Sequence, residues 1–281
     1  MTEINLGHPA VEGEMTFAVD TGVKPATFPT ELDPNTGIAR TTGLYETRNV
    51  SILNGRSVRD DLDLDDQGFI LVDHASSVSD FYDEDTVQDR YYSECTALVK
   101  KLTGVEKVAI FDHTIRIENA DKRNSGEIYR APVRSVHNDY TDWSAPKRVR
   151  DILPADEAEE RLTRRYIMVN VWRPLMEPVQ SWPLVLCDAR SMDPKDMIAA
   201  DHIYPDRRGE TYRTAYSAGQ QWYYFPEMNM KEVVILKCFD SETDGRARYS
   251  AHGAADLAGE PPSGYTPRES IEVRTIGFYG D

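Results

Sequence analysis

The alternation of hydrophobic and polar residues predicts that most of this chain forms β-strands. Residues 166–174 alternate most regularly and are rich in β-branched side chains, which favour strands. Similar patterns predict further strands at 15–19, 45–52, 69–72, 108–113, 126–140, 179–187, 221–225, 232–239 and 270–278. Many short strands between turn residues are typical of a β-sandwich or a jelly roll, whose mouth is a natural ligand site.

A few stretches depart from this pattern. Between Asp83 and Gly104 the apolar residues recur at helical spacing, which predicts one helix of about five turns that ends at the glycine. Residues 146–165 are strongly charged and compatible with a helical insertion. Residues 192–213 are polar and predict a loop, and the acidic residues 60–66 predict a solvated loop without a metal role.

The length of 281 residues is compatible with a single domain. We expect an N-terminal segment over residues 1–105, which wraps the surface and ends in the helix. The β core should then span residues 106–281, with insertions near 146–165 and 190–220. Helices would be few and would flank a mainly β structure.

Composition excludes several classes of function. The formal charge of −16 and the pI near 4.8 argue against a nucleic-acid surface, which needs clustered Lys and Arg. Cys95, Cys187 and Cys238 are odd in number and widely spaced, so we expect buried thiols in a reducing cytoplasm rather than disulfides or a zinc knuckle. No signal peptide and no membrane span are predicted. Exposed aromatic loops would permit a homodimer.

The clearest candidate chemistry lies in residues 135–140. His137 and Asp139 are two positions apart on a predicted strand, so both side chains would point to one face and could bind one ion. Iron(II) held by two histidines and one carboxylate needs a third ligand and keeps three positions open. We expect His252 to be this ligand. His202 is the rival, and we rank it second because it falls in the predicted loop.

An Arg-x-Ser sequence follows His252. Arg268 could bind a dicarboxylate through its forked guanidinium, and Ser270 could add a hydroxyl contact. A strand arginine more often pairs with a surface acid, and Glu269 or Glu272 could serve in this way. The order His-x-Asp, distal His and Arg-x-Ser resembles that of the iron(II)/2-oxoglutarate-dependent oxygenases.

Longer blocks of sequence carry a narrower resemblance. They are VHNDYT (136–141), NVWRPL (170–175), PVQSWPL (178–184), LCDAR (186–190), WYYFP (222–226), KCFDS (237–241) and PRESIEVR (267–274). Over roughly residues 100–281 the chain resembles the family of the bacterial cephem 7α-methoxylase subunit and the fungal hydroxylase/desaturase enzymes of secondary metabolism. One departure is the long interval between Asp139 and His252, which the two insertions could fill.

The resemblance implies a double-stranded β-helix, also called a jelly roll or cupin-like fold. It implies iron(II) at His137, Asp139 and His252, and a 2-oxoglutarate cosubstrate whose far carboxylate meets Arg268 and Ser270. The implied enzyme is a non-heme dioxygenase that uses O₂ to hydroxylate, desaturate or cyclise a small secondary metabolite.

Side chains on the strand at 166–174 extend this picture. Asn170 and Trp172 share one face and Arg173 takes the other. If the shared face is the interior, Asn170 could bind the 1-carboxylate of the cosubstrate, and a satisfied Asn beside a core Trp is equally compatible. Aromatic residues that could line the substrate pocket, or simply fill the core, are Tyr140, Trp143, Trp172, Tyr223 and Phe225.

Two other functions stay open at this point. One is a catalytically silent jelly-roll partner of a biosynthetic enzyme. The other is a metal-dependent cupin-type enzyme that needs no 2-oxoglutarate.

Overall fold

The structure is a computed structural model that describes residues 10–32, 39–123 and 129–280. Its helices are α1 (Glu84–Thr86), α2 (Tyr92–Thr103), α3 (Ala120–Arg123), α4 (Ser144–Ile152) and α5 (Ala155–Leu162). Its strands are β1 (Ala10–Val19), β2 (Ala26–Leu32), β3 (Ala39–Thr41), β4 (Leu44–Asn54), β5 (Phe69–Asp73), β6 (Lys107–Ile117), β7 (His137–Asn138), β8 (Tyr166–Pro174), β9 (Leu184–Cys187), β10 (Met197–Ile203), β11 (Arg208–Thr214), β12 (Trp222–Tyr224), β13 (Glu232–Asp240), β14 (His252–Ala254), β15 (Asp256–Leu257) and β16 (Glu269–Phe278).

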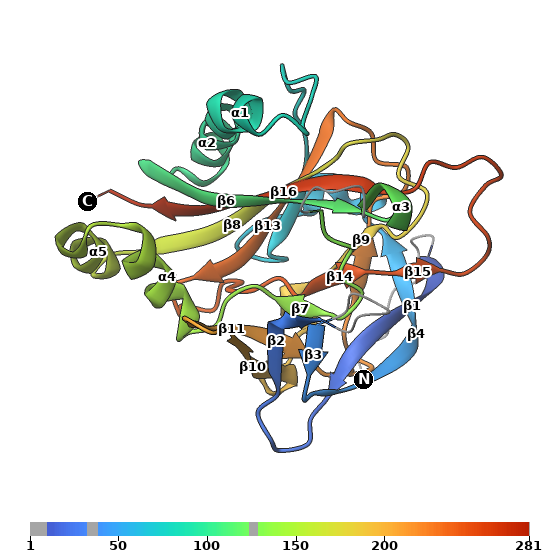
Figure 1. The fold of residues 1–281 in the computed structure, drawn as a ribbon, viewed down its shortest axis with the longest axis horizontal. Helices are drawn as coiled ribbons and strands as arrows, with labels where there is room; N and C mark the ends of the chain where they lie inside the picture. Colours follow the sequence, from blue (N-terminus) through green and yellow to red (C-terminus); the bar gives the residue numbers. More distant parts are fainter. Residues whose placement is uncertain (1–9, 33–38, 124–128, 281) are drawn as a thin grey trace.

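Two β-sheets pack against each other (Figure 1). The smaller sheet has the strand order β5-β13-β8-β16-β6, and all of its neighbouring strands are antiparallel. The larger sheet has the order β15-β1-β4-β12-β9-β14-β7-β11-β10-β2-β3. Helices α1 and α2 lie over the outer face of the smaller sheet, while α4 and α5 lie at one end of it (Figure 1). The prediction of a mainly β protein with flanking helices is confirmed.

The alternating pattern of β8 places its side chains in two different cores. Tyr166, Met168 and Trp172 belong to the cluster between the two sheets, together with residues of β4, β9 and β12. The intervening residues Ile167 and Val169 pack against the helical layer outside the smaller sheet. Because successive strand residues face opposite sides, Asn170 and Trp172 share a face, as the sequence predicts, and that face is the interior.

Arg173 points outward, toward the segment that precedes β6. Its guanidinium is fully buried, and it donates to the hydroxyl of Tyr91 at 2.9 Å and to Nδ1 of His74 at 2.6 Å. These contacts connect the smaller sheet to the helical layer.

The predicted helix between Asp83 and Gly104 is present, and residues 87–91 within it form a π-helical turn. It ends at Gly104, whose φ of 75° is in the left-handed region that favours glycine. The helical structure expected at 146–165 is also present, as α4 and α5.

Three predictions of secondary structure are wrong. The loop expected at 192–213 contains the hairpin β10–β11, whose polar strands gain their hydrogen bonds from β7 and β2. The strand expected at 126–140 is reduced in the described residues to β7, and Asp139 lies in a bend just beyond it. Residues 1–48 hold β2 and β3 in addition to the one strand expected there, and these strands join the larger sheet.

The acidic residues 60–66 do more than face solvent. The carboxylate of Asp65 pairs with Lys237 at 2.5 Å and with Arg246 at 2.9 Å. Lys237 is 1% exposed and also contacts the buried Asp240 at 2.9 Å. Because a buried ammonium needs a nearby anion, Asp65 and Asp240 stabilise this end of β13.

Other features bear on the environment of the protein. All three cysteines are free and buried, in agreement with the prediction. Within the described ranges, no helix combines the length and the apolar character that a membrane span requires.

The contact between Arg173 and His74 predicts a pH-dependent stability. Burial and the Arg173 charge lower the pKa of His74 below its ordinary value. His74 therefore binds a proton more readily in the unfolded chain than in the folded chain. As a result, this group lowers the free energy of unfolding as the pH falls below ~6.5. His74→Gln keeps an acceptor for Arg173 but does not titrate in this range. We expect urea unfolding to show a smaller loss of stability between about pH 7 and pH 5 for His74→Gln than for the wild type. Equal losses would contradict this role of His74.

Candidate metal centre

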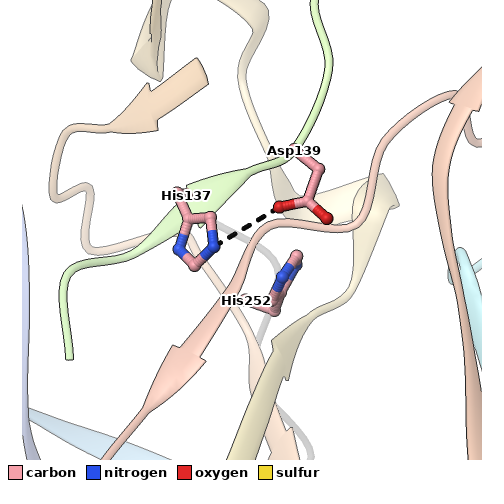
Figure 2. Close-up of side chains that lie close together, drawn as sticks. All are labelled: His137, Asp139 and His252. Atoms are coloured by element: carbon pink, nitrogen blue, oxygen red, sulfur yellow. Dashed lines mark ion pairs between the residues drawn. The ribbon is translucent and has the colours of Figure 1, made fainter. Parts of the chain in front are cut away.

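Three predicted residues converge in the interior. The ligand atoms of His137, Asp139 and His252 all lie within 4.8 Å of one another, and the three side chains face a common point (Figure 2). Nε2 of His137 lies 3.6 Å from Oδ1 of Asp139, and the two imidazole rings are 4.6 Å apart between centroids. His137 and His252 are buried, with exposed fractions of 9% and 3%. Two imidazole nitrogens and one carboxylate oxygen form the donor set of non-heme iron(II) sites.

Strand pairing brings the two histidines together. β7 and β14 are antiparallel neighbours, and His252 is directly opposite His137. Residues directly opposite each other in such a pair point to the same face of the sheet. His252 is also opposite Leu186, which belongs to the cluster between the sheets, so this face is the interior.

Backbone carbonyls fix the orientation of both imidazoles. Nδ1 of His137 lies 2.8 Å from the carbonyl oxygen of Ser135, and Nδ1 of His252 lies 2.9 Å from that of Ser250. Because a carbonyl only accepts, each Nδ1 carries the hydrogen and each Nε2 keeps a free lone pair. Burial and the neighbouring His252 hold the pKa of His137 well below its ordinary value, which favours the neutral form that binds metals.

Asp139 is held by two donors from the smaller sheet. Its Oδ2 accepts from the amide of Asn170 at 2.8 Å and from Nε of Arg274 at 3.3 Å. Glu272 completes the cluster, because its Oε1 contacts the Asn170 amide at 2.9 Å and Nη2 of Arg274 at 3.1 Å. Burial alone would raise the pKa of Asp139, but the charge of Arg274 and the hydrogen bond from Asn170 hold it well below its ordinary value. Oδ1 is left facing His137.

Arg268 and Ser270 lie beside the three ligands. Arg268 is 3% exposed, and a small cavity lined by it also reaches His137, His252 and Trp172. Among the described residues no carboxylate comes within ion-pair distance of this guanidinium; Nη1 donates to the carbonyl of Trp182, and Nη2 lies 3.4 Å from Oγ of Ser270. Burial and the nearby Arg116 charge lower the pKa of Arg268 to about 9.

Two residues that line this cavity each carry a buried donor without an acceptor. The donors are Nε of Arg268 and the indole nitrogen of Trp172, whose ring centroid lies 5.1 Å from the Arg268 guanidinium carbon. Buried donors are rarely left unpaired, so the cavity fits an oxygen-rich anion. The cavity has a volume of only about 20 Å³, so it must enlarge to admit such an anion. The carbonyl of Trp182, which accepts from Arg268, would have to give up this contact.

The other predicted residues occupy different positions. Trp172 lines the cavity, whereas Tyr140, Tyr223 and Phe225 pack elsewhere in the cluster between the sheets. Trp143 is 47% exposed.

One predicted role changes with the structure, and the ligand that was ranked second is left out. The amide hydrogens of Asn170 are shared by Asp139 and Glu272, so none is free for the 1-carboxylate of a cosubstrate. The rival ligand His202 contacts Thr211 and Arg213, and it is outside the group formed by His137, Asp139 and His252.

Sequence reasoning missed the roles of Arg116, Glu272 and Arg274. Arg116 and Glu272 line the cavity, and Arg274 contacts Asp139. A signal for two of them was available, because Glu272 and Arg274 continue the alternation that starts at Arg268 and Ser270.

Comparisons with known proteins agree with this geometry. The family model described as "Oxidoreductase/YMDC permease-like domain" matches residues 15–278. The hydroxylase/desaturase efuI of Hormonema carpetanum is 34% identical over 84% of this chain and 85% of its own length. The Fe(II)/2-oxoglutarate-dependent dioxygenase nvfI of Aspergillus novofumigatus is 32% identical over 96% of this chain and 97% of its own length.

A solved structure resembles the whole fold. The iron and alpha-ketoglutarate-dependent endoperoxidase NvfI superposes with a TM-score of 0.85 at 31% identity, covering 97% of this chain and 99% of that one. The predicted jelly roll is therefore confirmed, as is the resemblance to oxygenases. The chain belongs to the family of iron(II)/2-oxoglutarate-dependent dioxygenases and hydroxylase/desaturases, and it is an oxidoreductase.

Proposed function

We propose that this enzyme binds iron(II) through His137, Asp139 and His252 and oxidises a small secondary metabolite with 2-oxoglutarate and O₂. The observation that carries the proposal is the arrangement of three ligand atoms within 4.8 Å, with both Nδ1 atoms bonded to carbonyls. When bound, iron(II) and 2-oxoglutarate activate dioxygen and supply the oxidising power for removing hydrogen from a substrate. Hydroxylation, desaturation and oxidative cyclisation all start from that removal.

The residues of this chain orient the site and exclude water. Ser135 and Ser250 direct each Nε2 lone pair toward the metal position through their carbonyls. Arg274 and Asn170 hold Oδ2 of Asp139, so Oδ1 is the oxygen directed at the metal. We assign Asn170 to this positioning role.

Arg268 is proposed to bind the far carboxylate of 2-oxoglutarate, with Ser270 beside it. A buried guanidinium without an ion-pair partner gains a counter-ion when a carboxylate binds, which offsets the cost of burying its charge. The contact between Arg268 and the Trp182 carbonyl would have to open first.

We further propose that residues 1–281 act as one domain in the cytoplasm. Three buried free thiols suit a reducing compartment. A homodimer is part of the same proposal, supported by the exposed side chains of Trp143 and Tyr216.

Removing a metal ligand should abolish metal binding. We expect His137→Ala and Asp139→Ala to lose stoichiometric iron(II) and the formation of succinate, because two remaining ligands cannot hold the ion. Iron content under anaerobic conditions and succinate release measure the two effects. His113→Ala is the matched control, since His113 is a strand histidine that contacts Tyr92. Near wild-type turnover in both ligand variants would refute the assignment.

Loss of the Arg274 contact should weaken the metal site without removing a ligand. For Arg274→Gln we expect the iron(II) affinity to fall about 10–100-fold, because Asp139 is no longer held in place. A chelator competition titration measures the affinity, and circular dichroism reports the fold. Arg274→Lys, which keeps the charge, should recover part of the loss. An unchanged affinity in Arg274→Gln would show that Asp139 needs no such support.

The Arg268 assignment predicts a selective effect on the cosubstrate. We expect Arg268→Ala to bind 2-oxoglutarate about 10–100-fold more weakly, since charged hydrogen bonds of about 1.5–3 kcal/mol are lost, while iron(II) content stays normal. Anaerobic titration of the visible absorbance of the iron and 2-oxoglutarate chelate measures this. Arg190→Ala is the control, because Arg190 is exposed and paired with Asp188. An unchanged 2-oxoglutarate affinity would exclude Arg268 from the site.

A further inference from the structure

A second buried arginine lies beside the candidate metal centre. Arg213 in β11 is directly opposite His137 in β7, so both side chains share the interior face. His202 in β10 lies on this face as well, because it alternates with Ile198, the residue opposite Arg213. Strands β7, β11 and β10 run side by side in the larger sheet (Figure 1).

The hydrogen bonds of Arg213 are few and long. Nη1 lies 3.4 Å from Oγ of Ser135, and Nη2 lies 3.3 Å from Nε2 of His202. Nε is buried without an acceptor, and the whole residue is only 8% exposed. In the described part of the chain, no carboxylate lies within ion-pair distance of this guanidinium. A buried positive charge without a counter-ion is costly, which points to an anion that binds from outside.

His202 accepts from Arg213 and adds no second positive charge beside it. Burial and the adjacent Arg213 lower the pKa of His202 to about 4, so it is neutral near pH 7. Its Nε2 receives contacts from Arg213 and from the hydroxyl of Thr211 at 3.3 Å. His202 and Thr211 are each only partly buried, so this end of the Arg213 environment is not closed off from solvent.

Arg213 and Arg268 flank the three ligands on opposite sides. The cavity at Arg268 runs along β9 and β14, where it is lined by Leu184, Gly253 and Ala254. In the sheet order β9-β14-β7-β11-β10, Arg213 lies beyond His137 in the other direction. An anion bound at Arg213 would therefore be a different group from the one assigned to Arg268.

We propose that Arg213 and His202 form the substrate subsite, and that the substrate carries a carboxylate which Arg213 binds. This inference rests on the proposed function and names the chemical class of its substrate. The carboxylate end would be held next to His137, and the remainder of the molecule would extend across the metal position. His202 acts as a neutral positioning residue for the guanidinium.

The test uses the full chain loaded with Zn(II) and 2-oxoglutarate, so that no turnover occurs. The probe is cyclohexanecarboxylate, its neutral counterpart is cyclohexanecarboxamide, and binding is followed by ligand-observed NMR titration. We expect the acid to bind the wild type and to bind Arg213→Gln at least about ten-fold more weakly. The amide should bind the two proteins with equal affinity. Arg208→Gln is the matched control, because Arg208 lies on the same strand but is exposed and paired with Asp201.

Several outcomes would overturn this inference. The first is equal binding of the acid and the amide to the wild type. The second is undiminished binding of the acid by Arg213→Gln. Loss of 2-oxoglutarate binding in a folded Arg213→Gln would show that Arg213 binds the cosubstrate rather than the substrate. If that variant does not fold, Arg213→Lys decides, because it keeps the charge and must still prefer the acid over the amide. Failure of the wild type to bind Zn(II) or 2-oxoglutarate would instead refute the proposed function.

Discussion

The pairing of β7 with β14 is the constraint on which the site depends. It places His252 opposite His137 with both imidazoles on the interior face. The segments before these strands orient the two rings, because the carbonyls of Ser135 and Ser250 accept hydrogen bonds from the two Nδ1 atoms in the same way. A slip of the register by one residue would turn one imidazole toward the opposite face and leave a single histidine in the interior.

A charged interior requires that each buried charge be compensated. The Asp139 carboxylate meets Arg274 and Asn170, and Glu272 balances the positive charge that Arg274 adds. Lys237 is compensated in the same manner by Asp65 and Asp240. Arg268 and Arg213 differ, because neither has an ion pair among the described residues. Compensated charges support the framework, whereas the two uncompensated arginines are the groups to which we assign bound anions.

The two sheets have separate tasks in this design. The larger sheet supplies the histidines, on short strands whose order follows from long-range pairing. The smaller sheet supplies Asn170, Glu272 and Arg274 from long regular strands. Its outer face is fixed by the helical layer, partly through Arg173 and His74. The position of Asp139 therefore depends on packing between the layers as well as on strand β7, which precedes it.

The sequence by itself determined the regular strands, the helix before Gly104 and the candidate ligands His137 and Asp139, with His252 preferred over His202 as the third. Those features depend on local alternation, on helical spacing and on residue types that metals require. Only the tertiary structure decided that residues 192–213 form a hairpin, that His252 rather than His202 joins His137, and that Asn170 faces Asp139. The physical reason is that polar strands and buried polar side chains take their hydrogen bonds from partners distant in the sequence, so a local pattern does not specify them.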